Sequence, residues 1–454
     1  MTQNLIYNKT FFKKVFTIAL PIALQNLIIS SINLADVFMI GKLGEKEIAA
    51  LGLSNQIMFL LVLLLFGINS GGAIFMSQFN GKKDSKNMKK VLGIVLITSF
   101  LAGIIFFLFV TFIPDILLKI YTKDNIVVDI GVRYLKIVSF SYLFTAISFV
   151  YSVQLRTINK AKLTVYSSFL ALIINITLNY LLIFGKFGFP KLGIEGAAIA
   201  TTIARSLECI FIVFLVYYNK YVFAAKFREM IGFNIVFVKK YFFTTLPVLL
   251  NEMIWSFGIA AYNIIYARIS TQAIASINIV GSVERILFVS LIGVASAASV
   301  MVGEKIGEQK EEEAFEYAIN FIKLIFIIGV ILSIILYGMT FFILDLYNIS
   351  ESVYRYSKYI MYILCFSLPM KGVNTVNIVG NLRAGGDTKL ALYIDTGALW
   401  LIGVPLSFIA AFYFKLPVYL VYFVTFFEEI TKAIFGIKRV FSKKWIKNLV
   451  KDID

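Results

Sequence analysis

Long apolar runs follow one another from one end of this chain to the other, and each is long enough to cross a lipid bilayer. Runs of roughly 18 or more apolar residues recur throughout the sequence. In total 59% of the residues are hydrophobic and only 15% are charged, whereas a soluble domain has about 25% charged residues. A transmembrane β-barrel would alternate apolar and polar residues in segments of about ten. The pattern therefore predicts an all-α polytopic membrane protein.

The apolar runs predict twelve transmembrane helices in two groups of six. We expect the first six at roughly 15–39, 50–78, 91–113, 127–155, 162–184 and 193–218, and the last six at roughly 241–267, 274–303, 315–343, 353–381, 388–412 and 416–437. These ranges define an N-terminal six-helix bundle (1–218), a cytoplasmic linker (219–240), a C-terminal six-helix bundle (241–437) and a basic amphipathic cytoplasmic tail (438–454). We expect the tail to lie on the membrane surface, and the first run to be kept as a helix because no signal-peptide cleavage site follows it.

The two groups of helices look like two copies of one unit. A shift of 226 positions superposes Pro21 on Pro247, Gln25 on Asn251, Asn26 on Glu252 and Gly67 on Gly293. The shift is 227 further on, where Arg156 falls on Arg383. Six helices per copy leave both copies facing the same way, which predicts a parallel repeat with its site near the membrane midplane. Small residues gather in the second helix of each copy and predict close helix packing.

The positions of the charged residues explain the net charge of +17. Lys and Arg cluster in the N-terminal segment, near 82–90, near 156–162, in the 219–240 linker and in the tail. All of these segments lie on one side of the predicted membrane, as the positive-inside rule requires of cytoplasmic loops. The pattern argues against a nucleic-acid partner, and it places both termini on the cytoplasmic side of the cell inner (plasma) membrane.

Histidine is absent, and the two cysteines, Cys209 and Cys365, lie inside apolar runs. The commonest metal ligand and the usual proton shuttle are therefore missing, and no cysteine spacing indicates a metal site or a disulfide framework. We expect no enzyme activity and no cofactor. Any proton chemistry must use carboxylates.

Acidic residues inside the predicted helices are the first functional candidates, because an acid in a membrane span costs a few kcal/mol. They are Asp36, Glu208, Glu252, Glu284 and Asp395. Glu208 lies three residues after Arg205, which favours a structural ion pair. Glu284 precedes Arg285 and could be neutralised by it, and Asp36 could be a solvated acid near the end of its helix. Glu252 has a side chain too short to reach the membrane surface easily, and Asp395 has no adjacent base, which favours a functional role for both.

Asn175 and Asn179 are four residues apart and share one face of the fifth predicted helix. Their carboxamides, together with Asp36, could coordinate Na⁺ through oxygen atoms, or they could hydrogen-bond neighbouring helices. A buried carboxylate could instead take up a proton near neutral pH. The residues by themselves leave Na⁺ and H⁺ both open as coupling ions.

Several segments resemble those of one known family. They are Asp36-Val37-Phe38-Met39-Ile40-Gly41, Asn175-Ile176-Thr177-Leu178-Asn179, Gly193-Ile194-Glu195-Gly196-Ala197-Ala198 and Asn381-Leu382-Arg383-Ala384-Gly385-Gly386. In their order and spacing, over essentially the whole chain, they resemble the multidrug and toxic compound extrusion (MATE) family of cation-coupled exporters. The resemblance implies a V-shaped, MATE-like pair of six-helix bundles that alternates access. It also implies that Asp36, Asn175, Asn179 and Thr201 bind the coupling ion. Asn179 stands where several members carry a second acid, which leaves that ion undecided.

The resemblance further implies secondary active antiport, in which organic, cationic and amphipathic compounds are exported in exchange for Na⁺ or H⁺. We expect substrate to bind at Glu252, Asn251, Trp255, Tyr262, Glu284 and Asp395, by charge and by cation–π attraction. Glu252 lies about a turn nearer its proline than the family pattern suggests. The expected partners are a small-molecule substrate and the lipid bilayer, and the expected state is a monomer.

Three other functions remain as alternatives. A flippase for a lipid-linked sugar or other lipid, from the same superfamily, would be favoured by a strongly basic cavity, whereas the charges inside the predicted helices are mostly acidic. An intramembrane enzyme is not supported, because the sequence shows no nucleophile–base pair and no metal-ligand cluster. A channel is not supported either, because no re-entrant, filter-like segment lies between the predicted helices.

Overall fold

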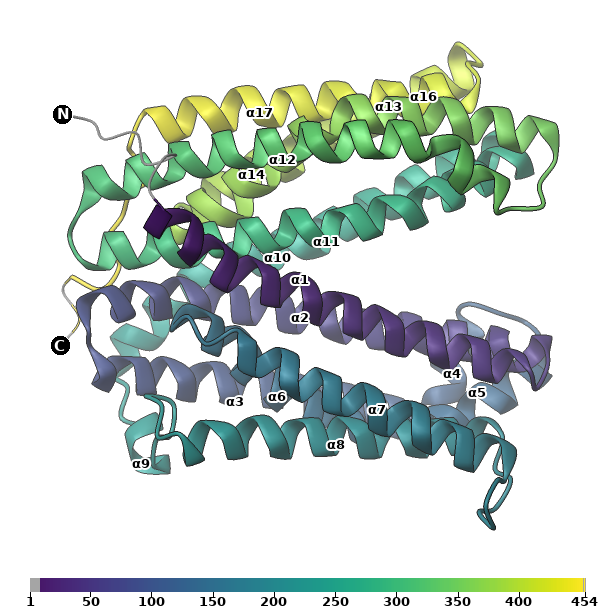
Figure 1. Cartoon of the computed structure of the whole chain (residues 1–454), viewed down its shortest axis with the longest axis horizontal. Helices are drawn as coiled ribbons and strands as arrows, with labels where there is room; N and C mark the ends of the chain where they lie inside the picture. The colour runs from purple at the N-terminus through teal and green to yellow at the C-terminus, as the bar shows by residue number, and fades with distance from the viewer. Residues whose placement is uncertain (1–8, 452, 454) are drawn as a thin grey trace. The chain divides into compact units, whose positions relative to one another are not determined.

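A computed structural model describes residues 9–451 and 453, and helices make up most of these residues (Figure 1). The first part of the chain forms α1 (Lys9–Gly41), α2 (Glu45–Lys82), α3 (Ser85–Phe112), α4 (Pro114–Lys119), α5 (Asn125–Val138), α6 (Phe140–Thr157), α7 (Lys162–Phe184), α8 (Ile194–Tyr218) and α9 (Phe227–Met230). The second part forms α10 (Ile235–Ile269), α11 (Thr271–Gly307), α12 (Glu311–Asp345), α13 (Glu351–Thr375), α14 (Thr388–Ala398), α15 (Val404–Phe408), α16 (Val418–Val424) and α17 (Phe426–Phe441). Three π-helical segments, η2 (Val376–Leu382), η3 (Leu399–Gly403) and η4 (Ile409–Tyr413), interrupt the later helices. The described residues include no strand, so the all-α prediction is confirmed.

Ten helices in the described part of the chain are long and apolar enough to cross a membrane. The bent pair α5 and α6 adds an eleventh span, with a bend of 51° at the single residue Ser139. α16 and α17 form one further helical segment, whose second part carries Glu428, Glu429 and Lys432. The structure is therefore consistent with the twelve predicted spans. The predicted 219–240 linker contains α9 and the first turns of α10.

The chain folds into two compact units. The N-terminal unit comprises Pro21–Met76 and Asp84–Tyr241, and the C-terminal unit comprises the chain up to Leu20, Ser77–Lys83 and the chain from Phe242 onward. Each unit has its own helix packing: α7 lies against α8 in the first, and α12 lies against α13 in the second (Figure 1). α1 and α2 each contribute residues to both units, so the units do not end where the apolar runs end.

Prolines stand at equivalent places in the two copies of the repeat. Pro21 lies inside α1 and Pro247 inside α10. A proline inside a helix removes one backbone hydrogen bond and loosens the preceding turn. η3 likewise ends just before Pro405, where the missing N–H favours a wider turn. The first helix of each copy therefore lacks a backbone hydrogen bond about one turn before its buried polar residues.

Glycines allow backbones to approach closely, as the sequence predicts. Gly72 of α2 faces Val95 and Gln154 within the N-terminal unit. In the C-terminal unit, Gly307 of α11 lies directly against the backbone of Gln78. Small residues at such contacts let helices pack at short distance in lipid.

Gly307→Leu is expected to destabilise the C-terminal unit, because its Cβ would overlap the backbone of Gln78. Overpacking of this kind costs about 1–3 kcal/mol, and more where only backbone can yield. The melting temperature of the detergent-purified protein should fall by several degrees. Gly281→Leu on the same helix is the control, because nothing lies within 4 Å of its Cβ position. Equal melting temperatures for the two variants would contradict the packing argument.

The C-terminal tail lies inside the protein and not on the membrane surface, where the sequence had suggested it would lie. The side chain of Trp445 is 0% exposed, and its Nε1 donates to Val440 O at 2.9 Å. The backbone N–H of Leu449 donates to Oε1 of Gln78 at 2.8 Å. Trp445 and Val450 of the tail are therefore buried by the C-terminal unit, with Gly385 making room for the indole ring of Trp445.

Candidate functional site

Asp36 is buried in the N-terminal unit, where α1 meets α7. Asp36 is 7% exposed, which argues against the alternative that it is a solvated acid near the end of its helix. Asn179 Nδ2 donates to Asp36 Oδ1 at 2.5 Å. Five acids inside the predicted helices were singled out in the sequence, and four of them form ion pairs with a Lys or Arg. Of these five, Asp36 is the one that has no such partner among the described residues. A buried carboxylate without a basic partner is costly when charged and is expected to bind a proton or another cation.

Amide and hydroxyl groups surround Asp36 as predicted. Asn179 Nδ2 also donates to Asn175 Oδ1 at 3.1 Å, and Asn175 Nδ2 donates to Thr201 Oγ1 of α8 at 3.3 Å. The structure therefore brings Asp36, Asn175, Asn179 and Thr201 into one continuous hydrogen-bonded group. The Oδ1 atom of Asn179 is buried and accepts no hydrogen bond from any residue that the structure describes. Because a carboxamide can rotate to exchange its oxygen and nitrogen, this side chain can either donate to Asp36 or offer an oxygen to a cation.

A second polar chain runs beside this group in the N-terminal unit. Gln25 Nε2 donates to Ser168 Oγ at 3.2 Å, and Ser168 Oγ donates to Glu208 Oε1 at 2.8 Å. Arg205 pairs with Glu208 Oε2 at 2.8 Å, which confirms the structural ion pair expected from their spacing. Arg156 NH2 donates to the other end of the chain, Gln25 Oε1, at 2.8 Å. These residues connect the first, fourth, fifth and sixth spans of the first copy.

In the C-terminal unit, Glu252 forms an ion pair that the sequence did not reveal. Arg383 NH2 lies 2.7 Å from Glu252 Oε1, and the Arg383 side chain is 2% exposed. Sequence analysis placed Arg383 in a loop, but the structure buries it just after η2. Glu252 is therefore neutralised by a base from another helix and is not an isolated negative charge.

Asp395 belongs to a larger cluster around Lys432 of α17. Lys432 Nζ lies 2.7 Å from Asp395 Oδ1 and 2.5 Å from Glu428 Oε1. Asn251 Nδ2 donates to Asp395 Oδ2 at 2.7 Å, and the hydroxyl of Tyr262 donates to Glu428 Oε2. Three residues predicted to bind substrate (Asn251, Tyr262 and Asp395) thus meet around one buried ammonium group. Gly403 packs so closely on Tyr262 and Glu428 that no side chain would fit there.

Glu284 of α11 pairs with Lys371 of α13 and not with its neighbour Arg285. Arg285 donates to Ser282 Oγ instead. Lys371 Nζ also lies 5.6 Å from the ring centroid of Tyr422, in a cation–π contact. With side chains 27% and 16% exposed, Glu284 and Lys371 form the most accessible of the three ion pairs made by Glu252, Glu284 and Asp395 with a described base. Trp255 is half-buried on α10.

Sequence reasoning missed four charged residues inside the predicted spans: Lys371, Glu428, Glu429 and Lys432. One local signal was present, since Glu428 and Lys432 are four residues apart on one helix face. Glu429 accepts from Asn374 Nδ2 at 2.7 Å, a contact between helices that no local spacing indicates.

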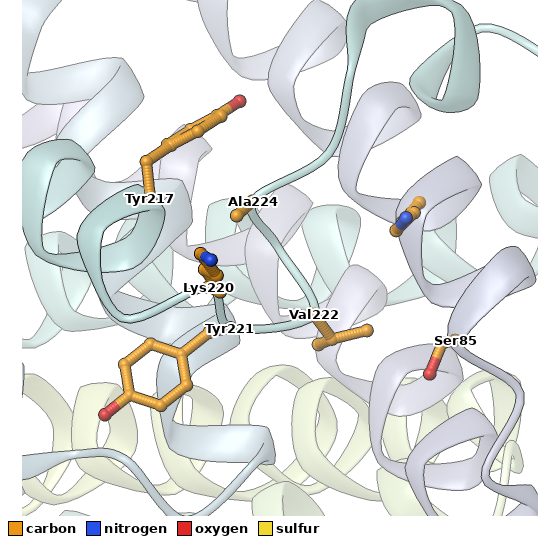
Figure 2. A pocket seen from close by; sticks show the side chains of 7 residues that line it. Ser85, Tyr217, Lys220, Tyr221, Val222 and Ala224 are labelled. Atoms are coloured by element: carbon orange, nitrogen blue, oxygen red, sulfur yellow. The ribbon is translucent and has the colours of Figure 1, made fainter.

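One hollow lies away from all predicted site residues. It has a volume of about 650 Å³ and is lined by Ser85, Lys89, Tyr217, Lys220, Tyr221, Val222 and Ala224. Figure 2 shows these side chains around the loop that follows α8. Nearby, Lys89 pairs with Glu229 at 2.7 Å, and the hydrogen bond from Lys89 lowers the pKa of the Glu229 carboxyl. Open, polar and formed largely by a loop, this hollow does not resemble the enclosed, mostly apolar sites that bind small molecules.

The chemistry of the two groups differs. The Asp36 group offers carboxylate, amide and hydroxyl oxygens, which suit Na⁺ or a proton. Within the described residues, no group of three or more Asp, Glu, Cys or His side chains has the arrangement of a metal site. In the C-terminal unit, each of the three acids singled out in the sequence is already neutralised by a Lys or Arg. A charged ligand could replace that base, but the acids do not need one to be neutralised.

Comparisons with known proteins agree with this architecture. The sequence model of the MatE family matches the chain twice, at residues 21–181 and 247–409, so each match begins at the proline of one repeat copy. The chain is 28% identical over 404 residues to the probable multidrug resistance protein YoeA of Bacillus subtilis, covering 88% of this chain and 86% of YoeA. It is 25% identical over 404 residues to the probable multidrug resistance protein NorM of Bacillus cereus, covering 87% of each. The crystal structure of the Vibrio cholerae MATE transporter VcmN in the bent form superposes with a TM-score of 0.87 at 18% identity, covering 96% of this chain and 99% of that one.

Proposed function

This chain belongs to the MatE family of multidrug efflux transporters, and on that premise we propose that it is a secondary active antiporter. It exports organic, cationic and amphipathic compounds in exchange for Na⁺ or H⁺ by alternating access. The protein acts as a monomer in the cell inner membrane, with both termini in the cytoplasm, as the distribution of Lys and Arg suggests. The similarity to multidrug resistance proteins does not favour the lipid flippase.

The observation that supports coupling is that Asp36 is buried and forms no ion pair with any Lys or Arg that the structure describes. A charged carboxylate at that depth is unfavourable, whereas a protonated or Na⁺-bound carboxylate is not. Binding of either ion therefore stabilises a conformation in which Asp36 is enclosed, as it is here. Release of the ion favours a conformation in which Asp36 is hydrated. Coupling then follows from different ion and substrate affinities in the two conformations.

For the substrate, we propose Glu284 and Trp255 as the contacts of the cargo. Lys371 already places a cation against Glu284 and over the ring of Tyr422. An organic cation can take the same position, because it offers the same charge to the carboxylate and the aromatic ring. Glu252, Asn251, Tyr262 and Asp395 are more deeply enclosed, and they are engaged in polar contacts with Arg383, with one another and with Glu428.

Transport in everted vesicles tests the proposal. Export of a fluorescent organic cation should be driven by an imposed Na⁺ gradient or by an imposed pH gradient, and it should stop when that gradient is collapsed. The gradient that drives export also identifies the coupling ion. Export that needs neither gradient, or that requires ATP, would contradict antiport.

A further inference from the structure

The two copies of the repeat place equivalent residues in equivalent contacts. A shift of 227 positions keeps the fifth span in register, since Lys162 falls on Lys389, Leu163 on Leu390 and Tyr166 on Tyr393. At the same shift, the polar residues of the fifth and sixth spans correspond as follows: Ser168 to Asp395, Thr201 to Glu428 and Arg205 to Lys432. The first-span amide donates to the fifth-span residue in both copies: Gln25 to Ser168 at 3.2 Å and Asn251 to Asp395 at 2.7 Å. The sixth span supplies a base to the same polar chain in both copies: the half-buried Arg205 in the first and the buried Lys432 in the second. The two polar groups are therefore variants of one arrangement.

An acid and a hydroxyl have exchanged places between the copies. In the N-terminal unit the first span carries the acid Asp36 and the sixth span carries the hydroxyl Thr201. At the equivalent positions of the C-terminal unit, the first span carries the hydroxyl Tyr262 and the sixth span carries the acid Glu428. Each copy thus has one carboxylate at this pair of positions, Asp36 in the first and Glu428 in the second. Of the two, only Glu428 has a basic partner among the described residues.

The ammonium of Lys432 occupies the position that a bound cation would need. It lies 2.7 Å from Asp395 and 2.5 Å from Glu428, and Lys432 is 5% exposed. The carboxamide of Asn251, 2% exposed, donates to Asp395, while its Oδ1 is buried and has no partner. Two carboxylates, a phenol and an amide oxygen therefore converge on this region, which is a ligand set of oxygens only.

We propose that the C-terminal unit contains a Na⁺ site in which the ammonium group of Lys432 occupies the position of the ion. While Lys432 is present, this unit needs no inorganic cation. Removal of the ammonium leaves two buried carboxylates that must recruit a small monovalent cation, because unpaired buried charges are strongly unfavourable. The consequence for transport, that ion coupling is confined to Asp36, rests on the proposed antiport function. The binding site itself does not.

The test measures Na⁺ binding by thermal stabilisation of the purified full-length protein in detergent, with N-methylglucamine chloride holding ionic strength constant. All variants carry Asp36→Asn, so that the N-terminal group does not contribute. Addition of Lys432→Gln should create a Na⁺-dependent rise in melting temperature of about 2 °C or more at about 150 mM NaCl. Asp36→Asn alone should show no such rise. Further addition of Asp395→Asn and Glu428→Gln should remove it.

Arg205→Gln in the Asp36→Asn background is the matched control, because Arg205 is the repeat equivalent of Lys432 and pairs with one acid, Glu208, in the described part of the chain. If Lys432→Gln is recovered only as aggregate, Lys432→Gln with Glu428→Gln keeps the net charge of the cluster and should still bind Na⁺ at Asp395. The proposal is overturned if neither Lys432 variant gains a Na⁺ response, or if the Arg205 control gains an equal one. These measurements need no transport, so failure here is separate from failure of the gradient experiment.

Discussion

Asp36→Asn is expected to abolish gradient-driven export while leaving the protein folded. Asparagine has nearly the shape of aspartate and keeps a hydrogen-bonding group opposite Asn179, but it cannot bind or release a proton and offers Na⁺ no charge. Export of a fluorescent cation from everted vesicles should fall to the level of vesicles without the protein. The melting temperature should not decrease, because a neutral amide is less costly to bury than a charged carboxylate.

Glu208→Gln is the matched control for Asp36→Asn. It removes a buried acid of the same unit whose charge is already balanced by Arg205 at 2.8 Å. This change should lower stability and leave the ion dependence of export unaltered. Wild-type export by Asp36→Asn, or loss of ion dependence in Glu208→Gln alone, would contradict the assignment of coupling to Asp36.

The fold was predictable from sequence because lipid imposes a simple rule on it. A helix that crosses the bilayer must be long and apolar, so the spans could be identified without knowing any partner. The repeat was visible for a similar reason, since Pro21 and Pro247 mark the same turn of two equivalent helices. The bend at Ser139 and the π-helical segments were not predicted, because they depend on packing between helices.

The candidate site was predictable only in part. The group of Asp36, Asn175 and Asn179 could be anticipated because two of its members lie four residues apart on one helix face. The ion pairs of the C-terminal unit could not, since Glu252 and Arg383 are separated by 131 residues and meet only after folding. An acid in an apolar run therefore indicates a buried charge, but the sequence does not reveal whether a base from another helix neutralises it.

Arg383→Gln and Glu252→Gln are expected to have very unequal effects on stability, although each breaks the same ion pair. Arg383→Gln leaves the carboxylate of Glu252 buried without a base, a situation that costs about 3–5 kcal/mol. Glu252→Gln leaves Arg383 facing a neutral amide. A comparable contact exists in the first copy of the repeat, where Arg156 is bound to a neutral amide, that of Gln25, at 2.8 Å, although Gln25 is the repeat equivalent of Asn251, the neighbour of Glu252. The cost should therefore be closer to that of one weakened hydrogen bond, about 1 kcal/mol.

The double variant Arg383→Gln with Glu252→Gln should recover most of the stability that Arg383→Gln loses, because it removes the unpaired charge. Melting temperatures of the two single variants and the double variant measure the coupling between the residues directly. Arg156→Gln is the control from the N-terminal unit: its partner Gln25 is neutral, so it should cost less than Arg383→Gln. Equal costs for Arg383→Gln and Glu252→Gln, or no recovery in the double variant, would show that Glu252 is not held as an anion by Arg383. Glu252 would then be free to bind a cationic substrate directly, and the division of roles between Glu252 and Glu284 would have to be reversed.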